Sequence, residues 1–351
     1  MTEFYIIKIL FFAALSFVIA LSLAPILTHF LYKYKLGKTI RNSGDTPVFS
    51  KLHAHKEGTP TMGGVLIWGT LLVLILLFYW LSLAFPNSIF GHLNFLSRAE
   101  TLLPLGALIA SALIGLVDDW LDIKSKGIMG GGGLKLRHRL LIYTLIAVIG
   151  ALWFYFKLDW TVFHVPFFGN FEIGAWYIPI FIFIIVATSF SVNETDGLDG
   201  LAGGTLLFAF AAYAVIAFAL GRYDMATFCA VIIGALLSFL WFNIPPARFY
   251  LGDTGSMSLG VTLGIIALLT NNSLLLLFIG LVFVIESLSV IIQIASKKIR
   301  KKKVFRSAPI HHHFQAIGWP ESKIVMRFWV ISAMGVALGL IIFLLDRNLS
   351  A

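Results

Sequence analysis

The 351-residue sequence has few charged residues and a single cysteine. Charged residues make up 12% of the chain, whereas a soluble domain usually carries about 25%. The single cysteine, Cys229, excludes an internal disulfide framework. The sequence also lacks the polar and apolar alternation over about ten residues that is typical of transmembrane β-strands. These absences exclude an ordinary soluble domain, a disulfide-stabilised domain and a transmembrane barrel.

Long apolar runs make up most of what is present. Hydrophobic residues account for 59% of the chain, and the mean hydropathy is +0.93. Runs of about 20 apolar residues are long enough to cross a hydrocarbon core of about 30 Å. We therefore expect an all-α polytopic integral membrane protein, a single domain over residues 1–351, in which residues 1–28 form the first span and not a cleaved signal. The ten predicted spans cover about 4–28, 62–83, 100–117, 138–156, 176–192, 199–220, 225–243, 255–270, 274–296 and 326–345.

The net charge of +9 is unevenly distributed between the two sets of loops. The segments 31–60, 118–139, 193–198, 244–254 and 297–325, with the flanking Arg327, hold 21 of the 26 basic residues. By the positive-inside rule these segments are cytoplasmic, and both termini lie on the outer side because the number of spans is even. The positive charge thus indicates orientation in a membrane and no nucleic-acid partner. Outside, residues 157–175 are expected to form a small interfacial hairpin.

The first acidic group closes the third predicted span, where Asp118 and Asp119 are adjacent. The C-terminal end of a helix already carries partial negative charge, so two carboxylates at this end favour a bound cation. Mg²⁺ would supply this charge, as would the basic residues Lys124 and Lys126. The alternative interpretation is a solvated helix end with no function.

The second polar group lies between the fifth and sixth predicted spans. Asn193, Asp196 and Asp199 are spaced by three residues, so a helical turn would place them on one face. Gly197 and Gly200 permit tight backbone geometry or the close approach of a ligand. So many polar groups between two apolar spans favour a binding site over a structural loop.

Asp253 opens the eighth predicted span between two glycines. The first turn of a helix presents unpaired N–H groups, and these suit a phosphate. A plain N-cap role for Asp253 is the alternative.

Three consecutive histidines, His311, His312 and His313, lie within the chain, so they are not an expression tag. Imidazole binds metals when it is neutral and phosphate when it is protonated. The seven Lys and Arg residues between positions 297 and 306 are expected to anchor on anionic membrane lipids. Glu286, inside the ninth predicted span, is expected to form an interhelical hydrogen bond.

All of these groups except Glu286 are assigned to the same membrane face. A carboxylate-rich site with a basic rim suits phosphoryl transfer, because Mg²⁺ bound by carboxylates offsets the charge of the reactants. A site at the membrane surface suits one soluble and one lipid-borne substrate. The residues by themselves indicate this class of reaction and no particular substrate.

Taken in order, the motifs resemble the phospho-N-acetylmuramoyl-pentapeptide transferase family within the polyprenyl-phosphate N-acetylhexosamine-1-phosphate transferase superfamily. The triple histidine followed by Gly-Trp-Pro separates this family from its sugar-phosphate relatives. The residues that carry the resemblance are 58–64, 118–119, 193–200, 241–243, 250–256, 308–314 and 318–320.

The resemblance implies that UDP-N-acetylmuramoyl-pentapeptide gives its phospho-sugar to undecaprenyl phosphate. The products would be lipid I and UMP, and Mg²⁺ would be required. The enzyme would lie in the bacterial cytoplasmic membrane with its site facing the cytoplasm, and it could form a homodimer. A lipid groove would lie beside a kinked ninth span.

The resemblance also implies roles for individual residues. Asp253 would be the main Mg²⁺ ligand, and Asp118, with Asp119 beside it, would serve as metal ligand and base for the lipid phosphate. The nucleotide and diphosphate pocket would be lined by Asn193, Asp196, Gly197, Leu198 and Asp199. Contacts to uridine would come from Lys56, Asn243 and the ring of Tyr250. Phosphate or the sugar would be held by His311, His312 and His313.

Two departures from the family pattern affect affinity and local geometry more than the reaction. Glu194 replaces a usual leucine, and residues 123–137 differ from the usual loop. Two alternative functions remain open at this point. One is a transferase that moves a simpler UDP-N-acetylhexosamine onto the same lipid, and the other is a cation-coupled transporter or flippase.

Overall fold

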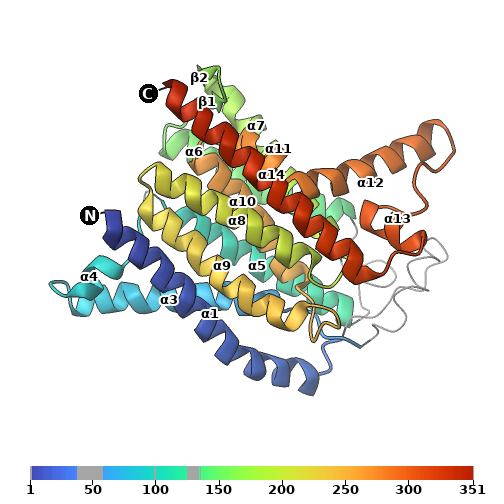
Figure 1. The fold of residues 1–351 in the computed structure, drawn as a ribbon, viewed down its shortest axis with the longest axis horizontal. Coiled ribbons are helices and arrows are strands. Elements are labelled where there is room, and N and C mark those ends of the chain that lie inside the picture. Colours follow the sequence, from blue (N-terminus) through green and yellow to red (C-terminus); the bar gives the residue numbers. More distant parts are fainter. Residues whose placement is uncertain (1, 38–57, 99, 125–133, 135, 351) are drawn as a thin grey trace.

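The computed structural model describes residues 2–350 apart from 38–57, 99, 125–133 and 135. It is a helical bundle with one small hairpin (Figure 1). In the described part of the chain, nine helices are long and apolar enough to cross a membrane, and one bent pair makes a tenth. This confirms the all-α polytopic fold. The spanning helices are α1 (Thr2–Lys33), α3 (Gly64–Ala84), α5 (Leu102–Ile123), α6 (Leu136–Lys157), α7 (Tyr177–Thr195), α8 (Leu201–Ala219), α9 (Tyr223–Asn243), α10 (Gly252–Leu269) and α14 (Glu321–Ser350).

Helix α10 is the centre of the bundle, and every one of its residues is buried. Its many glycines, serines and threonines let neighbouring helices approach closely. A Cβ at Gly64 of α3 would collide with the backbone of Gly255, so the two helices cross at paired glycines. Ser258 and Thr262 of α10 donate to carbonyls of their own helix at 2.6 and 2.7 Å, and Thr254 donates to the Ala112 carbonyl of α5 at 2.8 Å. This satisfies polar groups that lipid could not solvate.

The ninth predicted span is broken rather than straight. After the 3₁₀ turn η3 (Ser273–Leu275), the short α11 (Leu276–Ile279) meets α12 (Leu281–Ile299) at Gly280 with a bend of 85°. Helix α12 then projects from the bundle toward the short α13 (Ile310–Ala316) (Figure 1). Its outward face carries exposed apolar side chains, among them Ile291 and Ile294. The resemblance implied this kink; a lipid groove beside it stays a prediction.

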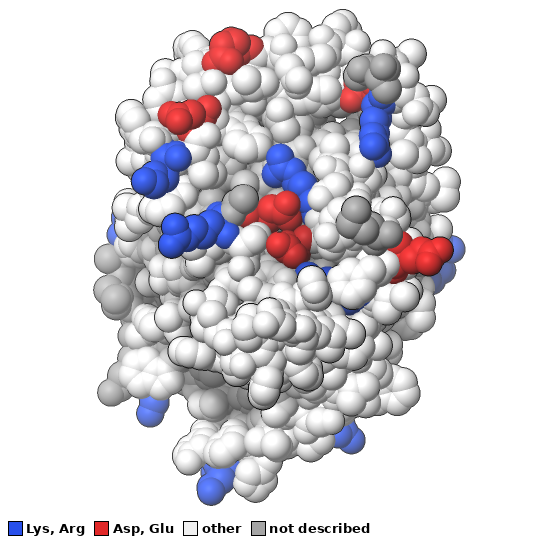
Figure 2. Space-filling model, turned by 90° about the vertical axis from the view of Figure 1, so that its left-hand side faces the viewer, with Lys and Arg blue, Asp and Glu red and all other residues white. Residues whose placement is uncertain are grey.

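The start of α1 and the end of α14 lie at the same end of the bundle (Figure 1). Figure 2 looks onto this end and shows a mostly uncharged surface with scattered basic and acidic side chains. The short helix α4 (Ile89–Leu93) lies at this end as well. The chain from the end of α12 to α13, which holds the seven basic residues between positions 297 and 306, lies at the opposite end (Figure 1). This arrangement agrees with the even number of spans and with the uneven charge count.

The predicted outer hairpin is present. Strands β1 (Val162–Val165) and β2 (Gly169–Glu172) pair antiparallel, and the 3₁₀ turn η2 (Gly174–Trp176) leads from them into α7. His164 Nε2 lies 2.7 Å from a carboxylate oxygen of Asp346 in α14. The other oxygen of Asp346 accepts the Phe167 backbone N–H at 2.7 Å. The last helix therefore fastens the hairpin at the end of the bundle where the chain begins and ends.

Candidate active site

The adjacent acids Asp118 and Asp119 are both buried, at 0% and 2% exposure. Helix α5 continues past them to Ile123, so they lie one after the other on a helix and point to different neighbours. The interpretation as a solvated helix end is wrong. Because a buried carboxylate is costly unless it is paired or hydrogen-bonded, the partners of each acid define its role.

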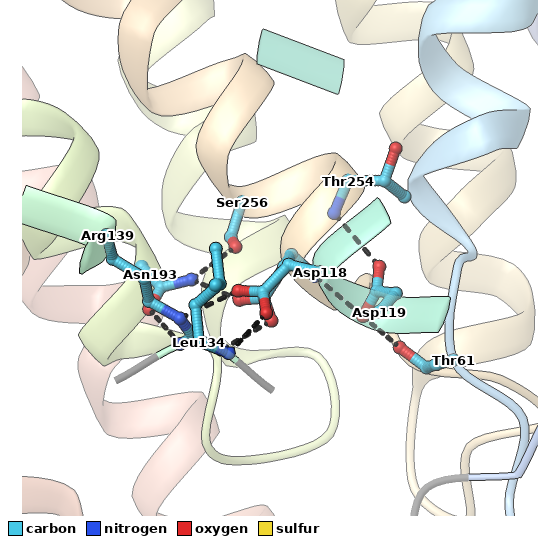
Figure 3. A network of polar contacts seen from close by, with 9 residues as sticks. Thr61, Asp118, Asp119, Leu134, Arg139, Asn193, Thr254 and Ser256 are labelled. Carbon is cyan, nitrogen blue, oxygen red and sulfur yellow. Dashed lines mark hydrogen bonds and ion pairs between the residues drawn. The ribbon is translucent and has the colours of Figure 1, made fainter. Parts of the chain in front are cut away.

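Arg139, in the first turns of α6, bonds to two acids and one amide from three other helices (Figure 3). Its Nε donates to Asp118 at 2.8 Å, and its Nη2 donates to Asp253 at 2.7 Å. Its Nη1 donates to the side-chain oxygen of Asn193 at 3.1 Å. Asn193 in turn donates to the other oxygen of Asp253 at 2.6 Å and to Ser256. One guanidinium thus bridges two carboxylates, a geometry that its fixed fork of donors allows.

Asp119 has a different task, although it is the next residue. Its carboxylate accepts the backbone N–H groups of Asp253 and Thr254 at 3.1 and 3.0 Å. Those are free N–H groups of the first turn of α10, so Asp119 caps the helix from outside. Asp253 is the second residue of α10 and not its N-cap, which is Leu251. The helix N-terminus proposed for phosphate is therefore already occupied by a carboxylate.

The segment that precedes α3 lies against the start of α10. The Gly63 and Gly64 N–H groups donate to the carbonyls of Tyr250 and Leu251, each at 2.8 Å. Thr61 Oγ1 donates to Asp119 at 3.0 Å. The segment before α3 and the start of α10, nearly 190 residues apart in the sequence, are thus held side by side. Lys56, for which a uridine contact was predicted, lies outside the described residues.

The segment between α7 and α8 does not continue the helix. Helix α7 ends at Thr195, and Gly200 has a left-handed φ of +81°. The prediction that Asn193, Asp196 and Asp199 share one helical face is therefore wrong. Asn193 faces Asp253, whereas Asp199 Oδ2 accepts the N–H of Ala247 at 3.1 Å. Asp196 directly follows the helix as its C-cap.

Two further residues predicted to contact the nucleotide have structural partners. Asn243, at the end of α9, accepts the Gly200 N–H at 2.8 Å and donates to the Phe249 carbonyl at 2.9 Å. Leu198 is packed in an apolar cluster with residues of α8, α12 and α14. Asn243 therefore holds two segments in place with its amide, and Leu198 anchors the segment by burial.

A cavity of about 290 Å³ lies beside these segments and is lined by Thr59, Asp199, Pro245, Pro246, Ala247, Tyr250 and Glu321. Tyr250 is hydrogen-bonded to Thr59, and burial together with the nearby carboxylates of Asp199, Glu321 and Asp196 raises the pKa of Tyr250 to about 12. The phenol is therefore protonated at neutral pH. The cavity brings Asp199 and Tyr250 together, as the predicted nucleotide pocket requires.

The three histidines have separate hydrogen-bond partners, although the ring centroids of His311 and His312 lie only 4.0 Å apart. His311 is fully buried, and its Nδ1 lies 3.0 Å from Glu286 of α12. His312 Nδ1 lies 2.8 Å from Gln315, and His313 accepts the Arg306 N–H. The predicted interhelical hydrogen bond of Glu286 is confirmed. Burial lowers the pKa of His311 to about 3, so this ring is neutral at physiological pH.

His311 also borders the segment between α7 and α8. A Cβ at Gly197 would collide with His311 Nε2, so this ring lies against the Gly197 backbone. Only a glycine fits here, because any side chain would displace the imidazole. The second and fourth motifs are therefore in direct contact.

The described residues contain no group of three or more His, Cys, Asp or Glu side chains placed to hold a metal ion. Mg²⁺, however, prefers oxygen ligands, keeps several waters and is usually bound by one or two carboxylates. Asp118 and Asp253, joined through Arg139, together with the amide oxygen of Asn193, match this requirement in donor type. Asp119 fits it less well, because the start of α10 already uses its oxygens.

Sequence analysis did not identify Arg139, Thr61 or Glu321 as site residues. Arg139 was counted only as one of many basic residues at a membrane face. A basic residue within the first turns of a predicted span that follows an acidic pair would have been the available signal. For Glu321 no local signal existed, because an acid in the first turn of a helix is common for reasons of capping and dipole alone.

The fold and the buried acidic site define a class: a polytopic membrane protein with carboxylates of several spans gathered at one end of the bundle. Residues 101–271 match the sequence model described as "Glycosyl transferase family 4". Residues 56–67 match signature 1 of phospho-N-acetylmuramoyl-pentapeptide-transferase.

Full-length comparisons give the particular family. The chain is 40% identical over 337 residues to the phospho-N-acetylmuramoyl-pentapeptide-transferase of Anoxybacillus flavithermus, covering 95% of this chain and 97% of that relative. It is 41% identical over 334 residues to that of Geobacillus thermodenitrificans, covering 94% and 96%. For Chloroflexus aggregans the identity is 39% over 349 residues, covering 95% and 89%. The chain belongs to the phospho-N-acetylmuramoyl-pentapeptide-transferase family.

Proposed function

We propose that this protein transfers phospho-N-acetylmuramoyl-pentapeptide from its UDP-linked form to undecaprenyl phosphate, forming lipid I and UMP. An oxygen of the lipid phosphate attacks the phosphorus that carries the sugar, and UMP leaves. Family membership supports the reaction. The location of the active site is inferred from one observation: Arg139 bridges Asp118 and Asp253, which brings charged groups of three helices to one point.

A bound Mg²⁺ would supply charge neutralisation for the diphosphate and for the charge that develops as UMP leaves. Asp253 and Asp118 would hold it, with Asn193 as a further oxygen donor. Asp118 would also accept the proton of the lipid phosphate if that group is protonated. Asp119 would position Asp253, since it accepts the backbone N–H of that residue.

Arg139 faces the same point as the acids and carries a charge that suits phosphate oxygens. In the structure its donors point to the two carboxylates and Asn193. An entering diphosphate would compete for them, and the metal would then neutralise the acids. The site thus keeps its carboxylates compensated before the substrates arrive.

The cavity beside Tyr250 suits the uridine end of the substrate. Its Asp199 and Glu321 carboxylates repel phosphate and accept hydrogen bonds from ribose hydroxyls or the base. The Tyr250 ring offers an aromatic face for stacking. His311 lies against Gly197, two residues before the Asp199 of this cavity.

The site faces the cytoplasm of a bacterial inner membrane in this proposal, with both termini outside. The uneven distribution of basic residues supports this orientation. The seven basic residues between positions 297 and 306 would contact anionic lipid headgroups. Association of two copies into a homodimer stays a prediction.

The experiment is UMP release by the purified full-length protein in detergent with undecaprenyl phosphate and Mg²⁺. The nucleotide substrate is either UDP-N-acetylmuramoyl-pentapeptide or UDP-N-acetylglucosamine. We expect release from the muramoyl substrate alone, and loss of release with EDTA or with Asp253→Asn. Glu172→Gln, an exposed acid in the outer hairpin, is the matched control and should retain full activity.

Each alternative predicts another outcome. Release from UDP-N-acetylglucosamine alone would assign the simpler sugar as substrate. No release from either substrate would contradict the transferase and favour a cation-coupled transporter. Labelled phospho-sugar bound covalently to Asp118 in the absence of lipid acceptor would contradict the direct displacement.

A further inference from the structure

Glu321, the first residue of α14, lines the cavity that also holds Asp199 and Tyr250. Its Oε1 accepts the backbone N–H of Asp199 at 2.7 Å. The side chain of Asp199 is held separately, because its Oδ2 accepts the Ala247 N–H. A residue from the C-terminal part of the chain therefore fixes the backbone of a residue that lies 122 positions earlier.

Glu321 is not the only contact between α14 and the segment 196–200. The Trp329 indole N–H, two turns further along α14, donates to the Gly200 carbonyl at 3.1 Å. A Cβ at Gly204 would collide with the same indole, so α8 and α14 are in close contact here. The segment is thus clamped at two successive residues, Asp199 and Gly200, by one helix.

An acid in the first turn of a helix has an ordinary explanation. It interacts favourably with the partial positive charge of the helix N-terminus, which is worth about 0.3–1 kcal/mol at an exposed site. This explanation requires neither the bond to Asp199 nor a place in the cavity wall. Glu321 has both, so its position depends on a distant segment as well as on its own helix.

The cavity chemistry indicates which part of a ligand Glu321 meets. Two carboxylates and a protonated phenol make a wall that repels phosphate and accepts N–H and O–H donors. Acidic side chains bind ribose hydroxyls in this way in other nucleotide sites. The nucleoside end of a nucleotide fits this wall, and its phosphates would extend away from it.

We propose that Glu321 is a positioning residue for nucleoside recognition: its carboxylate fixes the Asp199 backbone and completes the acceptor wall of the cavity. This inference rests on the proposed function for the identity of the nucleotide substrate. It goes beyond that function by assigning a specific task to a residue outside the acidic, glycine-rich and histidine motifs. Its consequence is selective: loss of Glu321 weakens nucleotide binding and leaves the lipid acceptor unaffected.

The test uses the full-length protein in lipid nanodiscs, with Glu321→Ala, Glu321→Gln and Ser322→Ala. Glutamine keeps an oxygen that can accept the Asp199 N–H but removes the negative charge. Ser322 is an exposed first-turn neighbour and serves as the control. Two quantities are measured: the Kd of UMP, which needs no turnover, and the KM of each substrate during transfer.

For Glu321→Ala we expect the Kd of UMP and the KM of the UDP-linked substrate to rise about tenfold, which corresponds to about 1.4 kcal/mol. The KM of undecaprenyl phosphate and kcat should stay within about threefold. Glu321→Gln should recover most of the affinity, and Ser322→Ala should match the wild type. A helix-dipole role alone predicts a different pattern. Glu321→Gln would then behave like Glu321→Ala, and the KM values of both substrates would change together.

The outcomes separate this inference from the proposed function. Transfer by the wild type with unchanged UMP affinity in Glu321→Ala would overturn the inference and leave the function intact. If the wild type shows no transfer and the variant binds UMP more weakly than the wild type, the result would support the inference and contradict the function. If the alanine variant does not fold, Glu321→Asp carries the test, because its shorter side chain withdraws the acceptor while the charge remains. Wild-type affinity in that variant would overturn the inference.

Discussion

Asp119 accepts the backbone N–H of Asp253 at 3.1 Å, so the second acid of the adjacent pair fixes the helix that carries the third acid. The same carboxylate accepts the Thr254 N–H and the Thr61 hydroxyl. Three segments of the chain therefore meet at one buried carboxylate. Asp118 bonds instead to Arg139, so the two adjacent acids hold different parts of the site.

We predict that Asp119→Ala lowers both stability and activity. Loss of a helix cap typically costs about 0.5–2 kcal/mol, and the buried N–H groups of Asp253 and Thr254 would lack their acceptor. Asp118→Ala should abolish transfer while lowering stability less, since it removes fewer backbone contacts. Thermal unfolding and UMP release, measured on the same preparations, check this. Equal midpoints for Asp119→Ala and the wild type would contradict the capping role.

A second prediction concerns Arg139. Arg139→Gln leaves Asp118 and Asp253 without their shared positive charge, and we expect transfer to fall by about 10²–10³. Arg139→Lys should recover only part of the loss, because an ammonium is a point charge without the fork that reaches both acids. Arg137→Gln, at an exposed basic residue two positions earlier in the same helix, is the control. Full activity in Arg139→Gln would show that the bridge is not needed.

The spans could be predicted because hydropathy is a local property of the sequence. Contacts of individual side chains could not. Arg139 and Asp118 are 21 residues apart, and nothing in the sequence between them indicates that they meet. The spacing of Asn193, Asp196 and Asp199 was misleading because α7 ends at Thr195, and the C-cap Asp196 already leaves the helical conformation with a ψ of 52°.

The same distinction holds for the residues expected at the nucleotide. Asp199 and Tyr250 line one cavity, and its role as a nucleotide pocket stays a prediction. Leu198 and Asn243 are next to that region but serve packing and backbone hydrogen bonds. A motif contains both kinds of residue, so it indicates a region, and only the three-dimensional contacts show what each residue does there.

A third prediction follows from the low pKa of His311. The folded protein holds this ring neutral down to about pH 3, whereas an unfolded histidine takes up a proton near pH 6.5. Below pH 6.5 the unfolded state binds more protons, so stability is full above that pH and falls as the pH is lowered. Unfolding midpoints from pH 8 to pH 5 should decline less in His311→Gln than in the wild type. Parallel curves would contradict a buried neutral ring.

The last prediction tests the orientation of the protein with cysteine chemistry. The native Cys229 is fully buried, and burial makes it unreactive toward a membrane-impermeant maleimide. Labelling of a variant with one engineered cysteine therefore comes from that cysteine alone. Asn87 lies beyond the C-terminal end of α3, at the end of the bundle opposite the acidic site, and Lys302 lies on the basic segment after α12. In intact bacterial cells made permeable only at the outer membrane, Asn87→Cys should react and Lys302→Cys should not.

After lysis both variants should react, and the unmodified protein should stay unlabelled throughout. Labelling of Lys302→Cys in intact cells, with Asn87→Cys protected, would invert the topology and place the acidic site outside. That outcome would separate the site from a UDP-linked substrate made in the cytoplasm, so the cysteine pair tests the orientation on which the proposed reaction depends.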